Sequence, residues 1–380
     1  MLTGYFAFSD TTRLVQEVTR RGGDFVSGLT GYAAGPGLAQ IVASEWLDFG
    51  HANTYHRSRR RVTTEREFNR LTAAGRSVVK SGSNPRKIEA EARWFETLPP
   101  ALRIYAPAYL GMAQAAGEVS YAVEYLHHPT LADLFVFGRL ERATWDSILS
   151  ACDEFLAATS LFPAPSETHA DMRGLYLEKI LERLSAHAAA TGIKLSEPCR
   201  LGAAWLPSLE RMATLAASRI PEAAPAQMVR MHGDFCFSNI IYDARGDVIR
   251  VIDPRGLDQG GGLSPYGDIR YDIAKLHHSA IGRYDLIIAG YYSLSQHGPL
   301  ELELELPDDP PRRAVADAFL DRRFAGLTPE AAAAHAISVL LFLSMLPLHA
   351  DDPKRQAALL ANAMRLFLEL DNPAAGRRAA

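Results

Sequence analysis

The sequence predicts an α+β fold in which a β-rich N-terminal part is followed by a larger, mainly helical part. Strand-like runs end at Lys80 and Leu126, and a helical segment lies between them. Beyond Thr130 apolar residues recur at three-to-four spacing, which is typical of helices, as far as Asp371. Two apolar β-like runs around a polar loop, residues 229–256, interrupt this helical part.

Composition limits the classes of protein that fit. The chain has 380 residues, of which 48% are hydrophobic and 22% charged, so it can bury a sizeable core. The formal net charge of −4 gives no electrostatic reason to expect nucleic acid or an anionic membrane as a partner. Three cysteines, at positions 152, 199 and 236, have no metal-ligand spacing, and the start MLTGYFAFSD lacks a secretory pattern. We therefore expect a cytoplasmic protein.

The first strand-like run and the helix after it are marked by local signals. Arg76 to Lys80 forms a short apolar run with a lysine at its end. Asn84 is a suitable N-cap and Pro85 a suitable first helical residue, and Pro99 follows the end of the segment RKIEAEARWFETL. A strand followed closely by a helix is expected here.

The buried face of this helix decides which acid points inward. Ile88, Ala92 and Phe95 mark an apolar stripe. Glu91 shares that stripe, whereas Glu89 is turned away by roughly 200° at 3.6 residues per turn. Glu91 is therefore the expected inward acid, with Glu89 as the alternative.

Two further strands are predicted after the helix, at Tyr105 to Leu110 and Ser120 to Leu126, separated by a glycine-containing turn. Two other segments stand out later in the chain. Ala331 to Ala350 carries no charged residue over twenty positions, but its histidines and proline favour a buried core helix over a membrane span, with Thr328 as N-cap. The Leu/Glu alternation in Gly298 to Asp309 predicts a strand with one solvated face.

A constellation of oxygen donors occupies the polar loop between the two β-like runs. His232-Gly233-Asp234 is followed five residues later by Asn239, and Asp253 lies fourteen residues beyond that, at a strand end. Mg²⁺ prefers such hard oxygen donors and usually takes only one or two carboxylates. A further carboxylate beside them suits a nucleophilic hydroxyl, so the pattern indicates phosphoryl transfer.

These residues resemble the aminoglycoside phosphotransferase and choline kinase superfamily. In that family an HGD-x-x-x-x-N loop replaces the HRD loop of protein kinases, and an Ile-Asp strand end replaces DFG. A third family feature, Gly-Asp followed by Asp-hydrophobic-Ala, is present here as Gly267-Asp268 and Asp272-Ile273-Ala274. The resemblance implies a protein-kinase-like bilobal fold, with a small β-rich N-lobe at residues 46–128 and a large helical C-lobe at 129–375. Residues 1–45 form an N-terminal extension.

The resemblance also implies roles for individual residues. Asp234 would orient the acceptor hydroxyl, and Asn239 and Asp253 would hold Mg²⁺. Lys80 would bind the α- and β-phosphates of ATP, and Glu91 would hold Lys80.

Supporting roles follow in the same way. His232 and Asp272 would brace the catalytic loop, and Glu124, Tyr125 and Leu126 would form a hinge whose main chain pairs with adenine. Arg255 would meet a phosphate or an anionic acceptor, or else form a salt bridge within the fold.

The segment before the first strand offers weaker signals. Gly50 and Asn53 resemble a choline-kinase-like nucleotide loop, with the following tyrosine one place early. The segments LTGYFAFSD and WLDFGHANTY loosely resemble the tail of a sugar nucleotidyltransferase.

Together these features predict an ATP- and Mg²⁺-dependent phosphotransferase that moves the γ-phosphoryl group to a hydroxyl of a small molecule. The nucleotidyltransferase-like start favours a sugar or surface-glycan precursor as acceptor. The alternatives are a choline or aminoglycoside kinase, and a non-catalytic nucleotide-binding partner in glycan biosynthesis. Neither nucleic acid nor a membrane span is expected, and the sequence does not indicate an oligomeric state.

Overall fold

The computed structural model describes residues 6–39, 69–74, 76–115, 118–166, 172–258 and 260–370. The chain divides into two compact units, Met1–Thr63 and Thr64–Ala380. In the first unit the described residues include two helices, α1 (Thr11–Arg20) and α2 (Phe25–Ala33). Each begins at an aspartate whose carboxylate accepts a hydrogen bond from a main-chain N–H of the first turn. The predicted boundary at residue 45 lies outside the described residues and stays a prediction.

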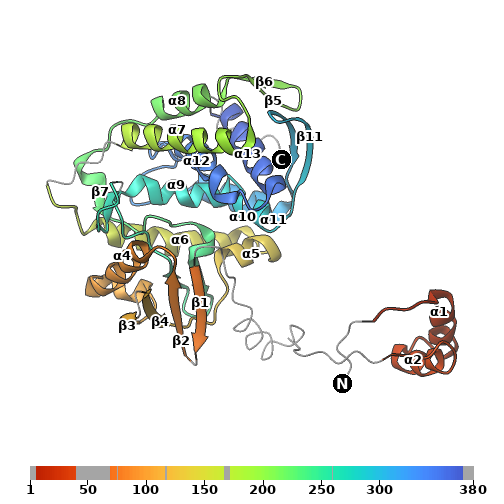
Figure 1. Ribbon diagram of the computed structural model, residues 1–380. Coiled ribbons are helices and arrows are strands. Elements are labelled where there is room, and N and C mark those ends of the chain that lie inside the picture. Colours follow the sequence, from red (N-terminus) through yellow and green to blue (C-terminus); the bar gives the residue numbers. More distant parts are fainter. Residues whose placement is uncertain are drawn as a thin grey trace. The chain divides into compact units, whose positions relative to one another are not determined.

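The second unit starts with a four-stranded antiparallel sheet (Figure 1). Its order is β1 (Asn69–Ala74), β2 (Ser77–Gly82), β4 (Glu118–Glu124) and β3 (Tyr109–Ala115). The strand expected up to Lys80 is confirmed as β2, and the strand expected at 120–126 is present two residues earlier as β4.

The strand predicted at Tyr105 to Leu110 was wrong in its position. Residues Pro100–Tyr105 form a 3₁₀ helix, and β3 begins only at Tyr109. Pro107 explains the late start, since proline has no N–H to donate to a strand ladder.

Helix α4 (Pro85–Glu96) packs against this sheet as its sequence predicts. The Asn84 side chain accepts from the Lys87 N–H, and Pro85 occupies the first helical position. Ile88, Ala92 and Phe95 are buried, and so is Glu91, which is only 1% exposed. The helix therefore brings one acid to the interior face of the sheet.

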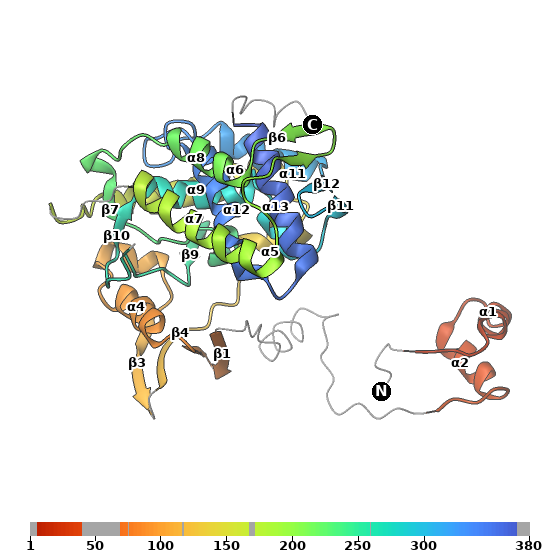
Figure 2. The same cartoon turned by 45° about the horizontal axis from the view of Figure 1, so that its top comes forward.

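Helices dominate the rest of the unit, and the views in Figures 1 and 2 both place the sheet of β1 to β4 at one side of them. These helices are α5 (Leu131–Phe137), α6 (Arg142–Ser160), α7 (Met172–Thr191), α8 (Leu209–Ser218), α9 (Ile269–Ala280), α10 (Tyr284–Ile288), α11 (Pro310–Leu320), α12 (Ala334–Met345) and α13 (Pro353–Leu368). The predicted two-lobed α+β fold, with a small β-rich lobe and a large helical lobe, is confirmed.

The uncharged segment near residue 340 is the buried core helix that was expected. Helix α12 is twelve residues long and contacts α7, α8, α9 and α13. Its predicted start was wrong: Thr328 caps only a short turn, and Ala333 adopts a left-handed φ of 50°, so the helix begins at Ala334. Among the described residues no helix has the length and hydropathy needed to cross a membrane.

Short strands lie between α8 and α9. β7 (Met228–Arg230) pairs with β10 (Tyr266–Asp268), and β8 (Ile240–Asp243) pairs with β9 (Val248–Val251), both antiparallel. 3₁₀ turns cover Pro225–Gln227 and Phe237–Asn239. These strands carry the loop from His232 to Asn239 and the strand end at Asp253.

A second four-stranded sheet lies on the far side of the helical lobe from the first (Figure 1). Its order is β11 (Ser293–Gly298), β12 (Glu301–Glu305), β5 (Cys199–Leu201) and β6 (Ala204–Leu206). The strand predicted from Leu/Glu alternation is confirmed as β12, where Leu302 is buried and Glu303 is exposed.

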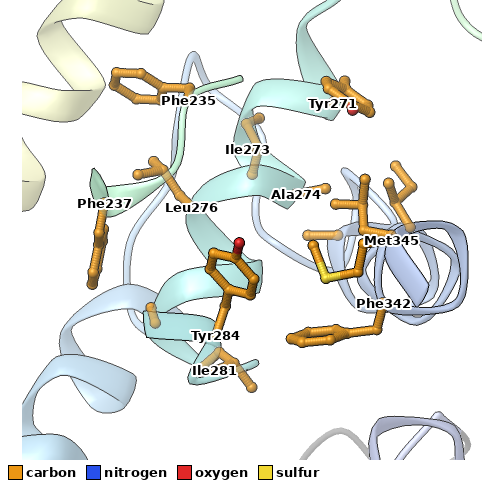
Figure 3. Packing of buried hydrophobic residues seen from close by; sticks show 14 of the residues in the cluster. Phe235, Phe237, Tyr271, Ile273, Ala274, Leu276, Ile281, Tyr284, Phe342 and Met345 are labelled. Carbon is orange, nitrogen blue, oxygen red and sulfur yellow. The ribbon is translucent and has the colours of Figure 1, made fainter. Parts of the chain in front are cut away.

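Helix α9 is packed on both sides, as Figure 3 shows. Phe235 and Phe237, from the loop after His232, lie on one side of it, and Phe342 and Met345 of α12 lie on the other. All four are buried. Dense packing of this kind gives the loop a rigid support, since buried aromatic side chains cannot shift without opening voids.

Candidate active site

The loop from His232 is fixed to helix α9 by one carboxylate. The main-chain N–H groups of His232 and Gly233 donate to the two oxygens of Asp272, at 2.7 Å and 2.8 Å. Burial raises the pKa of Asp272 to about 7, although both N–H donors oppose this by favouring the carboxylate. Asp272 therefore sets the direction in which the chain enters the loop.

The His232 ring supports the loop from the other side. Its Nδ1 accepts from the Asp234 N–H at 3.2 Å, so Nε2 carries the proton and donates to the Ile252 carbonyl at 2.9 Å. Burial lowers the pKa of His232 to about 4, so the ring is neutral at pH 7. Through this ring the loop is joined to the residue before Asp253.

Asp234 is held as an ionised, partly accessible carboxylate. Lys275 Nζ lies 2.7 Å from Oδ1, and Asn239 Nδ2 donates to Oδ2 and to the main-chain oxygen, both at 2.9 Å. Burial alone would raise the pKa of Asp234, but Lys275 outweighs it and lowers the pKa to about 2. The side chain remains 40% exposed, so a small molecule can reach it.

Lys80, Glu91 and Asp253 form a second charged group. Lys80 Nζ lies 2.7 Å from Glu91 Oε2 and 3.0 Å from Asp253 Oδ1. Burial would lower the pKa of Lys80, but Asp253 and Glu91 together raise it, so the lysine is charged. Lys80 is 3% exposed and Asp253 is 40% exposed, which leaves the aspartate as the accessible member.

Glu91, and not Glu89, is the partner of Lys80. The Tyr121 hydroxyl donates to the same Glu91 oxygen at 2.9 Å, while Glu89 pairs with Arg93 on the outer face of the helix. The expected pairing is thus confirmed in geometry, since the helical periodicity placed Glu91 inward.

The chain around Asp253 is tightly constrained. Asp253 has a left-handed φ of 56°, a conformation that is costly for an aspartate and often occurs at functional sites. Gly256 also has a positive φ of 60°, and a Cβ there would lie 2.2 Å from the Ala90 carbonyl oxygen. The segment after Asp253 therefore touches the helix that carries Glu91.

The predicted hinge begins at the last residue of β4, Glu124, and continues through Tyr125 and Leu126. The Glu124 N–H donates to Ala108 O and the Tyr125 N–H to Arg76 O, at 2.9 Å and 2.8 Å. Within the described ranges no residue forms a hydrogen bond with the main chain of Leu126. Gly50 and Asn53, the predicted nucleotide-loop residues, lie outside the described residues.

A shallow hollow of about 440 Å³ is found on the sheet, away from these charged groups. In the β2–β4 register Ser77 faces Glu124, whereas Lys80 faces Tyr121, so the two pairs point to opposite faces. The hollow is lined by Arg76, Ser77, Ala108, Leu110 and the predicted hinge residue Glu124, and it lies on the opposite face of the sheet from Lys80 and Tyr121.

Two contributors were missed by sequence reasoning. Lys275 follows Asp272 by three residues, so both lie on one side of α9, and this spacing was the available signal. Tyr121 gave no signal beyond its place in a strand. Among the described residues no group of three or more His, Cys, Asp or Glu side chains is arranged to hold a metal.

Several solved structures share a similar arrangement of elements at low sequence identity. An aminoglycoside phosphotransferase APH(4)-Ia mutant, in complex with AMP-PNP and hygromycin B, has 15% identity and a TM-score of 0.46, covering 80% of this chain and 91% of that one. A glucosamine kinase bound to glucosamine, ADP and phosphate has 14% identity and a TM-score of 0.38, covering 81% and 73%. The ADP-bound APH(2'')-Ib phosphotransferase has 12% identity and a TM-score of 0.41, covering 82% and 98%. No curated protein sequence matches the chain.

The family assignment rests on the sequence itself. The profile of the phosphotransferase enzyme family, abbreviated APH, matches residues 58–302. This range is more than half of the chain, and it contains Lys80, Glu91, Asp234, Asn239 and Asp253. The chain therefore belongs to the phosphotransferase enzyme family and is a kinase with an alcohol group as acceptor.

Proposed function

We propose that this kinase transfers the γ-phosphoryl group of ATP to a hydroxyl of a small molecule, with Asp234 at the acceptor and Asp253 at the nucleotide. The observation that carries the proposal is the ionised and accessible Asp234, held by Lys275 and Asn239. Phosphoryl transfer needs little covalent work from the protein, so positioned charges of this kind account for most of the catalysis.

At the nucleotide end Lys80 binds the α- and β-phosphates. Glu91 and Tyr121 limit its motion, and burial of the Lys80–Glu91 pair strengthens their mutual attraction. Glu124, Tyr125 and Leu126 offer main-chain groups to the adenine ring, and the sequence resemblance assigns Gly50 and Asn53 to nucleotide binding. The nucleotide-binding lobe spans residues 46–128 and the acceptor-binding lobe residues 129–375.

Asn239 and Asp253 are the residues that would hold Mg²⁺. The donor set fits the ion, because a carboxylate and an amide are hard oxygen ligands and Asp253 is 40% exposed. When bound, Mg²⁺ neutralises charge on the transferring phosphate. Lys80, which contacts Asp253 at 3.0 Å, holds that side chain directed towards the phosphates.

Asp234 acts mainly by orientation. With a pKa of about 2 it is a weak base at neutral pH, so it accepts a hydrogen bond from the acceptor hydroxyl and takes its proton only as the phosphoryl group transfers. The acceptor is a small molecule. Among the structural neighbours, one is bound to hygromycin B and another to glucosamine, and a sugar is our first candidate here.

The test is ADP release from ATP in the presence of pooled sugars, amino alcohols and aminoglycosides. The Asp234→Asn variant keeps the shape of the side chain but removes its charge, and we expect it to lose at least about 100-fold in kcat. Asp351→Asn is the matched control, since Asp351 is 57% exposed and pairs only with Arg355 on the surface of the protein as described. Tight ATP binding without acceptor-dependent ADP release would instead support a nucleotide-binding protein without catalysis.

A further inference from the structure

Four cationic side chains gather beside the catalytic loop, and the proposed transfer to a hydroxyl does not require all of them. Lys179 and Arg183 lie on α7, Arg255 lies two residues after Asp253, and Lys275 lies on α9. We call these four residues the cation cluster.

The ring of Tyr271 is the centre of the cluster. The Arg255 guanidinium lies 5.8 Å from the ring centroid and Lys275 Nζ lies 5.9 Å from it. Both distances are within the range of cation–π attraction. Tyr271 is buried and precedes Lys275 by one helical turn, so it forms a fixed platform between the two cations.

Two of the cations adjoin the catalytic loop directly. The Arg255 N–H donates to the His232 carbonyl at 2.9 Å, and a Cβ on Gly233 would lie 2.6 Å from the Arg255 Cβ. Lys275 Nζ is 2.7 Å from Asp234. An anionic group held between these cations would therefore lie next to the carboxylate that orients the acceptor hydroxyl.

Helix α7 adds the other two cations. Lys179 and Arg183 are four residues apart and so project from one face of the helix. Burial, and after it the charge of Arg255, lowers the pKa of both. The Arg183 guanidinium also donates to the Ser344 carbonyl of α12, and α12 packs against α9, the helix that carries Tyr271 and Lys275.

Among the described residues, few acids balance the cluster. Glu182 acts on both α7 cations, and Asp234 is paired with Lys275. Of the residues that the structure describes, no carboxylate forms an ion pair with Lys179, Arg183 or Arg255. Within the described ranges the Arg183 guanidinium donates to the Ser344 carbonyl, at 3.1 Å. Like charges held together repel each other, and an anionic ligand would relieve this repulsion.

We propose that the acceptor carries a carboxylate or phosphate group, which the cation cluster binds while Asp234 receives the hydroxyl. Guanidinium groups suit these anions because their planar N–H donors match two oxygens at once. The inference rests on the proposed function and names the class of its substrate: an anionic hydroxyl compound, such as a sugar acid or sugar phosphate, and not a polycationic aminoglycoside.

The first experiment compares probes that share a carbon scaffold and differ in the charge of one substituent. Glucose, glucosamine, glucuronate and glucose 6-phosphate form one set, and glycerol, glycerate and glycerol 3-phosphate form another. We expect the anionic members to have at least about tenfold higher kcat/KM, as one lost charge-assisted contact costs about that factor. A preference for the neutral or cationic members would overturn the proposal.

The second experiment removes the α7 cations. Lys179→Gln and Arg183→Gln should each raise KM for the preferred anionic probe about tenfold, with KM for ATP unchanged within about twofold. Lys194→Gln is the control, because Lys194 is 75% exposed and pairs with Glu197. If KM for ATP rises instead, the cluster serves the nucleotide phosphates and the proposal fails.

Binding is measured separately from turnover. In calorimetric titrations into the protein with AMP-PNP, glucose 6-phosphate should bind and glucose should show no binding. Arg183→Gln should weaken the binding of glucose 6-phosphate. If ADP release fails with every probe but this binding is present, the proposed catalysis fails while the anion site stands. Equal binding of glucose and glucose 6-phosphate would overturn the anion site.

Discussion

Glu91 provides the sharpest test of the charged group at the nucleotide end, because the same helix carries a matched surface acid. Glu91→Ala removes the buried partner of Lys80, which is 2.7 Å away, and leaves the Tyr121 hydroxyl without its acceptor. Breaking a buried ion pair costs about 3–5 kcal/mol, and we expect the lower limit of about 3 kcal/mol. The reason is that Asp253, at 3.0 Å, still neutralises Lys80.

Glu89→Ala is the control on the same helix. Glu89 pairs with Arg93 at 3.0 Å, with 33% and 51% of the two side chains exposed, and such pairs contribute about 0.3–0.5 kcal/mol. In urea, with a slope of about 3 kcal/mol/M, Glu91→Ala should lower the midpoint by about 1 M and Glu89→Ala by less than about 0.2 M. KM for ATP should rise only in Glu91→Ala. Equal midpoint shifts in the two variants would refute the assignment of Glu91.

Three further predictions concern the loop and its supports. Lys275→Met should raise the pKa of Asp234 from about 2, because Lys275 is the main group that opposes the effect of burial, and the acid limb of the kcat/KM profile should move to higher pH. Lys275→Arg should move it less, and an unchanged limb in Lys275→Met would contradict the assignment. The pKa of His232 falls from 6.5 to about 4 on folding, so the contribution of His232 to stability should be complete above pH 6.5 and be lost as the pH falls through this window, by about 3 kcal/mol. In urea titrations at several pH values the difference between the protein and His232→Gln should change by that amount, and an identical pH dependence of the two would exclude His232 as a contributor. Gly256→Ala should cost more than about 1 kcal/mol, since φ is 60° and the new Cβ would meet Ala90 O; a neutral effect on the thermal midpoint would show that this segment can move away from α4.

Features that depend on neighbours in the chain were predictable from the sequence. Asn84 and Pro85 correctly predicted the start of α4, because the N-cap hydrogen bond of Asn84 and the fixed φ of Pro85 both act within one helical turn. The periodicity of that helix also chose Glu91 over Glu89. The spacing of Asp234, Asn239 and Asp253 indicated phosphoryl transfer without any tertiary information.

Local signals failed where the backbone changes direction within a few residues. Pro107 delayed β3 to Tyr109, and the left-handed Ala333 delayed α12 to Ala334, although Thr328 made a capped turn as expected. Such changes depend on how the flanking elements pack, so the sequence pattern gave the type of each element more reliably than its first residue.

The sequence by itself indicated the kind of reaction, because the residues that we propose for it at the acceptor occur in one short stretch around His232-Gly233-Asp234. Only the tertiary structure decided which charges surround that stretch. Lys80 meets Asp253 across 173 positions of sequence, and Lys275 reaches Asp234 from a different helix. The cation cluster joins α7, α9 and the segment after Asp253. Contacts of this kind arise from packing, which no local pattern encodes, and the expected charge of the acceptor depends on them.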